Sequence, residues 1–197
     1  PACLVRFSRF VDRVHRCPRS GADPVGYLST VLRLLGDHHY DVLLPVNEQA
    51  YLFAWAHELL EPLTGLAVAG FDAFARVQTK TAFLHLLDEL GLPHPPSRIV
   101  HDWRALEGAV AELGHPCWVK TPEGTASMGV WPVRTPSETA RLRTVPGVIR
   151  ALESADGLVV QAHATGFFEQ AHAIFDRGRL VALRVDRRLA EGTHGGP

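Results

Sequence analysis

Two lysines stand out among the residues that could do chemistry. The chain of 197 residues has twenty basic residues, and all of them are arginines except Lys80 and Lys120. Arginine presents a wide planar fork, whereas the lysine ammonium is a compact point charge that fits beside a single phosphate oxygen. In a sequence that uses arginine almost everywhere else, this choice indicates that the two lysines have a chemical task.

A loop of small residues follows Lys120. In the stretch CWVKTPEGTASMGVWPV, residues 117–133, two strand-like segments flank this loop. Its small members are Gly124, Thr125, Ala126, Ser127 and Gly129. Their uncovered backbone N–H groups and hydroxyls could fold over phosphates that Lys120 also reaches. The alternative interpretation of this stretch alone is an exposed hairpin turn with a solvated lysine.

Ser127 belongs to a second motif, TASMG, which nearly matches the G-x-S-x-G turn that exposes a nucleophilic serine. Thr125 occupies the position of the first glycine, and the segment after the loop is typical of a strand rather than of the helix that this turn requires. A serine hydrolase that uses Ser127 is therefore the alternative function from a different class. A nucleotide-binding or interaction module without catalysis is a further alternative.

Two other motifs are incomplete. The segment HELLE, residues 57–61, resembles a zinc-protease helix, but Glu61 stands where the second histidine would be. The segment 6–16 carries four arginines interleaved with two phenylalanines. Because the net charge of the chain is −1 and no nucleic-acid motif is present, we expect no nucleic-acid partner.

Composition excludes several classes of protein. Apolar residues make up 46% and charged residues 21% of the chain, as in ordinary globular proteins. Three cysteines at wide spacing give no disulfide framework, which favours a cytoplasmic location. No apolar run approaches the roughly 20 residues of a membrane span, so we expect no membrane partner. Because the chain starts at Pro1 without a methionine, we expect a fragment of a longer protein.

Strands and helices alternate in residues 1–70. The expected elements are a strand at 2–7, a helix at 23–39, a strand at 41–46, a helix at 48–63 and a strand at 65–70. Asp23 is expected to cap the first helix. This βαβαβ rhythm favours a parallel sheet with helices on its faces.

The pattern changes near Gly70. The expected elements are helices at 72–91 and 102–114, strands at 117–121 and 128–133, a helical segment interrupted by Pro146, and strands at 157–164, 169–176 and 179–189. The sequence DRGR at residues 176–179 predicts an antiparallel hairpin between the last two strands. The fold class that follows is α/β, with an α+β second part.

Five segments in order resemble the ATP-grasp superfamily, most closely its carboxylate–amine ligase branch, which is similar to carbamoyl-phosphate synthase and biotin carboxylase domains. These are DVLLPVNEQAYLFAWA, VQTKTAFLHLLDELGLPHPPSRIV, LGHPCWVKTPEGTASMGVWPV, LVVQAHATG and AIFDRGRLVALRVDRRLAEGTHGGP. They cover nearly the whole chain. The resemblance implies a partial Rossmann-like pre-ATP-grasp domain at 1–70 and an ATP-grasp domain at 71–197 that is truncated in its C-terminal lobe.

The resemblance also implies roles for individual residues. Lys80 and Lys120 would hold the phosphates of ATP, and Lys120 is the expected catalytic residue. The other nucleotide-binding residues that it implies are Gly124, Thr125, Ser127, Met128, Gln161, Ala162, Ala164 and Glu169, and the implied substrate residues are Glu48 and Arg188.

Three positions depart from the family pattern. Gln161 replaces the usual hinge glutamate, but its amide keeps an acceptor and adds a donor. Thr121 replaces the usual proline after Lys120. In the family pattern an acidic residue near this position contacts the ribose. Glu169 is the nearest candidate, but its distance along the chain from Gly166 differs from that pattern by about one residue.

The implied reaction is the activation of a carboxylate by ATP as an acyl phosphate, which an amine or another nucleophile then attacks. The implied partners are ATP, a small carboxylate and that nucleophile, and a homodimer is compatible with the resemblance. The implied cofactor is Mg²⁺, whose ligands are expected beyond Pro197 and not within this chain. We expect this fragment to be inactive on its own.

Overall fold

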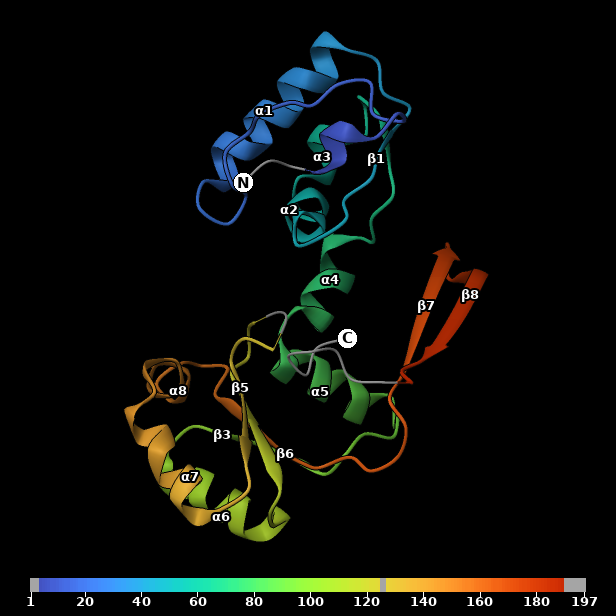
Figure 1. Ribbon diagram of the computed structural model, residues 1–197. Helices are drawn as coiled ribbons and strands as arrows, with labels where there is room; N and C mark the ends of the chain where they lie inside the picture. The colour runs from blue at the N-terminus through green and yellow to red at the C-terminus, as the bar shows by residue number, and fades with distance from the viewer. Residues whose placement is uncertain (1–3, 125–126, 190–197) are drawn as a thin grey trace. The chain divides into compact units, whose positions relative to one another are not determined.

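The protein is described by a computed structural model that covers residues 4–124 and 127–189 (Figure 1). The chain divides into two compact units, Pro1–Val77 and Gln78–Pro197. The sequence-based boundary after Gly70 assigns helix α4, Phe71–Gln78, to the second domain, whereas this division leaves nearly all of it in the first unit. No helix in the described parts of the chain is long and apolar enough to cross a membrane.

The first unit pairs two short parallel strands, β1 (Val42–Leu43) and β2 (Gly65–Leu66). Helices α1 (Pro24–Asp37), α2 (Gln49–Trp55) and α3 (His57–Leu60) surround them. The expected cap of α1 is confirmed, because the carboxylate of Asp23 accepts a hydrogen bond of 2.8 Å from the backbone N–H of Gly26. The core of the unit consists of Leu28, Leu35, Phe53, Ala56 and Leu60.

The expected strand at 2–7 is wrong where the structure describes it. Leu4–Phe7 forms a 3₁₀ helix, η1, and residues 1–3 lie outside the described part. A strand is stabilised by the hydrogen bonds of its ladder, and β1 and β2 pair only with each other among the described strands. The expected helix at 48–63 also divides, at Ala56, into α2 and α3.

The second unit is built on an antiparallel sheet with the strand order β3-β6-β4-β5. Its strands are β3 (Ser97–Val100), β4 (Cys117–Lys120), β5 (Val130–Val133) and β6 (Leu158–Ala162). Helices α6 (Trp103–Leu113), α7 (Pro136–Arg141) and α8 (Pro146–Leu152) lie on one side of this sheet, and α5 (Lys80–Glu89) lies on the other (Figure 1). A 3₁₀ turn, η2 (Leu142–Thr144), joins α7 to α8.

Alternation along β4 decides which side chains reach the site. Cys117 and Val119 are fully buried on the face that the three helices cover. Because successive side chains of a strand point to opposite faces, Trp118 and Lys120 lie on the other face. The buried cluster under the helices includes Val100, Leu106, Val110, Val133, Val148, Leu152, Leu158 and Val160.

The expected helix at 72–91 is interrupted at Thr79. The hydroxyl of Thr79 accepts a hydrogen bond of 3.1 Å from the backbone N–H of Ala82, so a new helix, α5, begins at Lys80. A threonine cap of this kind satisfies one of the free N–H groups of the first helical turn. The interruption therefore fixes Lys80 at the start of a helix rather than in its middle.

The predicted hairpin is confirmed by β7 (Glu169–Asp176) and β8 (Arg179–Arg187), which pair antiparallel. Its two-residue turn, Arg177 and Gly178, has φ values of 48° and 79°. Two positive φ values in a two-residue loop match the right-handed twist of a hairpin. Both strands are exposed almost throughout.

Candidate functional site

Lys120 lies on the face of the sheet opposite the helical core. In the strand register Trp118 pairs with Gln161, and Gln161 pairs on its other side with Ser97. These residues and Lys120 therefore share one face. The half-buried ammonium of Lys120 donates a hydrogen bond of 2.6 Å to Oε1 of Gln161.

The hydrogen bonds of Gln161 continue to the edge of the sheet. Its Nε2 donates to Oγ of Ser97 at 2.9 Å, and that hydroxyl donates to the backbone carbonyl of Pro95 at 2.7 Å. The amide of Gln161 is thereby oriented with its oxygen toward Lys120. Because the amide of Gln161 is held on both sides, it also fixes the position of the Lys120 ammonium, from which it accepts a hydrogen bond.

Lys80 approaches the same region from helix α5. Its backbone N–H donates to the carbonyl of Pro122 at 2.9 Å, and its ammonium donates to the carbonyl of Gly124 at 3.2 Å. The beginning of α5 is thus tied to the loop that follows β4. This loop begins directly after Lys120, so the two lysines are brought together.

Burial and neighbouring charges shift the pKa values of the two ammonium groups. Burial lowers the pKa of Lys120, and the positive charge of Lys80 lowers it further. Burial also lowers the pKa of Lys80, while the carboxylate of Glu123 partly opposes that effect. The hydrogen bond of Lys120 goes to the neutral amide of Gln161. A bound anion would therefore stabilise the charged form of both lysines.

A cavity of about 670 Å³ opens beside Lys120. Its volume lies in the range of about 300–1,000 Å³ that is typical of small-molecule sites. It is lined by Trp118, Lys120, Val130, Gln161, Ala162, His163, Ala164, Thr165, Gly166, Phe167, Phe168 and Arg188. The rings of Trp118 and His163 stack with centroids 6.4 Å apart, so one wall of the cavity is aromatic.

Comparison with known proteins gives the fold of this arrangement. No family model and no curated protein matches the sequence. The biotin carboxylase domain dimer of Hydrogenobacter thermophilus 2-oxoglutarate carboxylase, solved with MgADP, ADP and bicarbonate, matches with a TM-score of 0.59 and 16% identity. It aligns over 74% of this chain and 34% of its own.

Two further solved structures match similarly. D-alanyl-alanine synthetase A of Vibrio cholerae has a TM-score of 0.54 and 19% identity over 72% of this chain and 43% of its own. N5-carboxyaminoimidazole ribonucleotide synthetase of Thermus thermophilus has a TM-score of 0.51 and 19% identity over 83% of this chain and 48% of its own.

The chain has the ATP-grasp fold. This confirms the resemblance at the level of the fold, and with it the expected fold class. The chain spans less than half the length of each of these three proteins.

Several of the expected residues gather on one face of the ATP-grasp sheet unit. The ammonium of Lys80 donates a hydrogen bond to the carbonyl of Gly124, and that of Lys120 donates one to Oε1 of Gln161. The cavity beside Lys120 is also lined by the expected residues Gln161, Ala162, Ala164 and Arg188.

Other expected residues are placed elsewhere or cannot be placed. Glu169 forms an ion pair of 2.6 Å with Arg187 on the exposed hairpin, and Met128 is 65% exposed. Glu48 lies in the first unit, at the start of α2, where it lines a separate cavity. Thr125 lies outside the described residues.

Ser127 does not have the surroundings of a nucleophile. It is an exposed loop residue with a φ of 67°, and strand β5 rather than a helix follows it. Within the residues that the structure describes, no hydrogen bond joins Ser127 to a histidine. The geometry therefore gives the hydrolase alternative no support.

Sequence reasoning missed three residues of the site. Ser97 holds Gln161, and Trp118 and His163 form the aromatic wall. The position of Trp118 two residues before Lys120 on one strand was a usable signal, because it fixes a shared face. Ser97 gave no such signal, because it meets Gln161 only across paired strands.

Proposed function

We propose that the chain is the ATP-binding portion of an ATP-dependent ligase, which activates a carboxylate as an acyl phosphate for attack by an amine or another nucleophile. The observation that carries the proposal is the pair of half-buried lysines: burial lowers the pKa of both, the charge of Lys80 lowers that of Lys120 further, and a cavity opens beside Lys120. The ATP-grasp fold supports the same conclusion.

In this proposal the protein acts mainly by positioning and by charge. Lys80 and Lys120 offset the phosphate charges, and Lys120 has the catalytic role because it lines the cavity, whereas Lys80 does not. Gly124, Thr125, Ser127 and Met128 would approach the phosphates from the loop. Such donors cost no reorganisation when charge develops in the transition state.

The cavity beside Lys120 is proposed to hold the nucleoside. Gln161 and the backbone of Ala162 and Ala164 would bind the adenine, and Glu169 would contact the ribose after a movement of the hairpin. Glu48 and Arg188 are proposed as substrate residues.

Mg²⁺ is proposed as the metal that accompanies ATP, and one of the matched proteins was solved with MgADP. In the described ranges, no group of three His, Cys, Asp or Glu side chains could hold a metal ion. The proposal therefore takes the metal ligands from outside these residues. When bound, the metal would neutralise charge on the phosphates.

The proposed reaction has two steps. An oxygen of the carboxylate attacks the γ-phosphorus, the bond to the bridging oxygen breaks, and ADP leaves. The nucleophile then attacks the carbonyl carbon of the acyl phosphate, and phosphate leaves with the bonding electron pair. Because the chain spans less than half the length of its structural neighbours, we assign turnover to a longer protein. Cytoplasmic location and a homodimer belong to the proposal.

Displacement of a fluorescent ATP analogue by ATP and Mg²⁺ tests this function. We expect the parent to bind the analogue and the variant Lys80→Ala/Lys120→Ala to lose this binding. Arg104→Ala is the control, since Arg104 is an exposed cation on α6, away from the site. Equal binding of the analogue by the parent and the double variant would refute the proposed function.

A further inference from the structure

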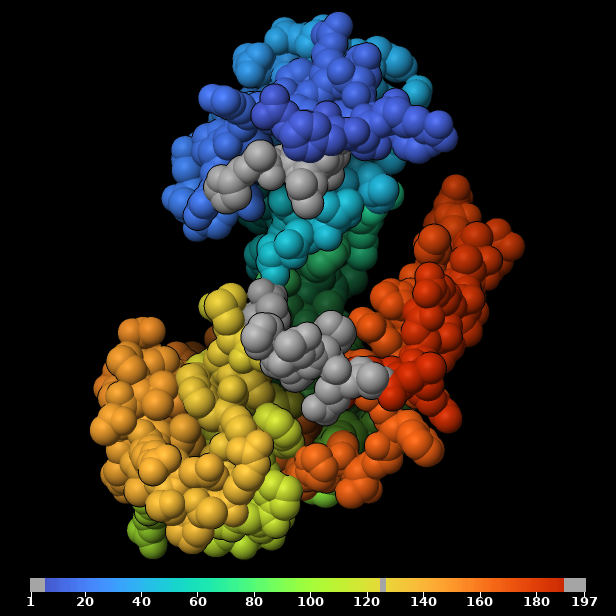
Figure 2. All heavy atoms as spheres, in the orientation of Figure 1, coloured from blue at the N-terminus to red at the C-terminus, as the bar shows by residue number. Residues whose placement is uncertain are grey.

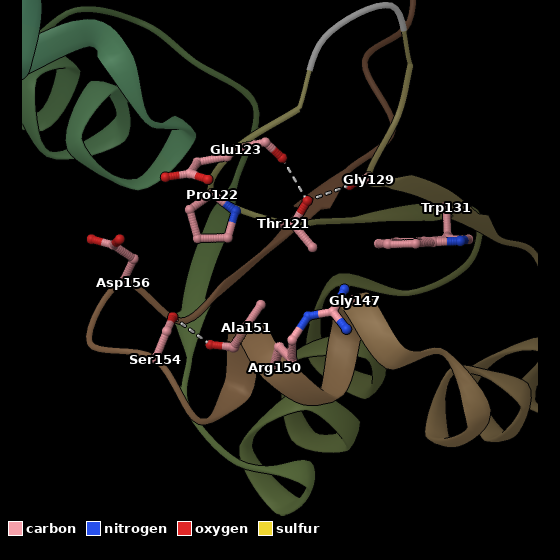
Figure 3. A pocket seen from close by; sticks show the side chains of 10 residues that line it. All are labelled: Thr121, Pro122, Glu123, Gly129, Trp131, Gly147, Arg150, Ala151, Ser154 and Asp156. Atoms are coloured by element: carbon pink, nitrogen blue, oxygen red, sulfur yellow. Dashed lines mark hydrogen bonds between the residues drawn. The ribbon is translucent and has the colours of Figure 1, made fainter. Parts of the chain in front are cut away.

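A second cavity lies on the other face of the same sheet (Figure 3). It has a volume of about 440 Å³. Trp131, one of its lining residues, pairs in the register with Val119, which belongs to the buried core. The cavity is therefore on the helix-covered face, where the loop-side ends of β4 and β5 meet α8, and Lys120 points away from it.

Arg150 on α8 supplies the positive charge of this cavity. In Figure 3 its guanidinium points into the space between α8 and the strands, on the same side as the ring of Trp131. Across residues 4–124 and 127–189, the guanidinium of Arg150 makes no hydrogen bond or ion pair. By contrast, Arg143 nearby forms an ion pair of 2.6 Å with Glu107. The donors of Arg150 are thus available to a carboxylate from outside.

Two carboxylates, those of Glu123 and Asp156, lie across the cavity from Arg150 (Figure 3). Asp156 also has no recorded partner in the described part of the chain, whereas Glu123 acts electrostatically on Lys80. Two carboxylates and one guanidinium leave one net negative charge, which disfavours a phosphate. The same arrangement matches a ligand that carries an ammonium at one end and a carboxylate at the other.

Trp131 provides an apolar wall between these charges. Its side chain is half-buried and packs partly against the core. A Cβ added at Gly147 would lie 3.6 Å from Cη2 of Trp131, so the backbone of α8 reaches one edge of the ring without covering it. An open indole surface of this kind suits an aliphatic or aromatic side chain.

We propose that this cavity binds a small zwitterion of the amino-acid type. Its carboxylate would pair with Arg150, its ammonium with Asp156, and its side chain would lie against Trp131. The site needs no nucleotide and shares none of the lining residues of the cavity beside Lys120. The test of this amino-acid site can therefore fail while the proposed ligase function stands, and the reverse also holds.

Saturation-transfer NMR in the absence of nucleotide tests the site. The probes are L-alanine, L-leucine, L-phenylalanine and L-lysine, titrated separately against the protein. We expect at least one to bind, and we expect Arg150→Gln and Asp156→Asn each to weaken that probe by about tenfold or more, the effect of losing a hydrogen bond to a charged group. Arg104→Gln is the matched control, because Arg104 is an exposed arginine on α6.

Derivatives of the bound amino acid identify which end meets which residue. The amide derivative lacks the carboxylate, so it should bind the parent and Arg150→Gln equally. The N-acetyl derivative lacks the ammonium, so it should not distinguish the parent from Asp156→Asn. Absence of binding by all four amino acids would overturn the proposal. So would binding that both variants leave unchanged.

Discussion

Replacing Lys120 by alanine is the sharpest test of the lysine pair. The change removes one charge-assisted phosphate contact, which is worth about 1.5–3 kcal/mol and corresponds to about a 10–150-fold loss of ATP affinity. Lys120→Arg should restore little of this loss, because the guanidinium fork is wider than a site shaped around a point charge.

The same substitution should not destabilise the fold. Burial lowers the pKa of Lys120, and Lys80 lowers it further, so the folded protein disfavours the charged form. Removing a half-buried charge that lacks a carboxylate partner is often neutral or stabilising. We therefore expect an unchanged or higher midpoint of thermal unfolding for Lys120→Ala, which separates lost binding from lost folding.

Calorimetric titration with ATP and Mg²⁺ measures this prediction. An ordinary surface lysine predicts that both variants bind as the parent does, since exposed charges contribute little. The reasoning is refuted if Lys120→Ala keeps the parent affinity. It is also refuted if Lys120→Arg restores that affinity fully.

Two further predictions use titrating groups. Lys80→Ala should raise the pKa of Lys120, because the charge of Lys80 lowers it; an unchanged Nζ titration in NMR would show that the two ammonium groups do not interact. The pKa of His94 is raised, first by its hydrogen bond to Asp88, so its contribution to stability should be complete below the ordinary histidine pKa of about 6.5 and lost as pH rises through the raised value. The unfolding midpoint of His94→Gln should therefore lie below that of the parent at about pH 5.5 and approach it at about pH 9, and equal differences at both pH values would contradict this.

Local patterns predicted the elements that carry the lysines. The strand-like segment CWVKT predicted β4, which carries Lys120, and DRGR predicted the β7–β8 turn. The break at Thr79 was missed because apolar residues continue at helical spacing on both sides, although a threonine before a helix is a cap signal. Strand β3 was also missed, because four residues with one buried side chain give little periodicity.

The sequence predicted individual residues of the site, but not the contacts between residues that lie far apart along the chain. Lys120 and Gln161 lie 41 residues apart, and Gln161 and Ser97 lie 64 apart. Their contacts depend on the strand order β3-β6-β4-β5, which no local pattern encodes. The cavity around Arg150 was missed for the same reason, since it forms only where α8 meets the ends of two strands.

The scarcity of lysine has a practical consequence for labelling chemistry. Apart from the terminal amine, the chain offers acylating reagents two primary amines, Lys80 and Lys120, and the structure places both at one site. Because their pKa values are lowered, a larger fraction of each is unprotonated, and therefore nucleophilic, near neutral pH than of an ordinary lysine. Besides the terminal amine, a succinimidyl ester should thus mark this site in the unaltered protein. Protection from that reagent by ATP would report occupancy without a single mutation.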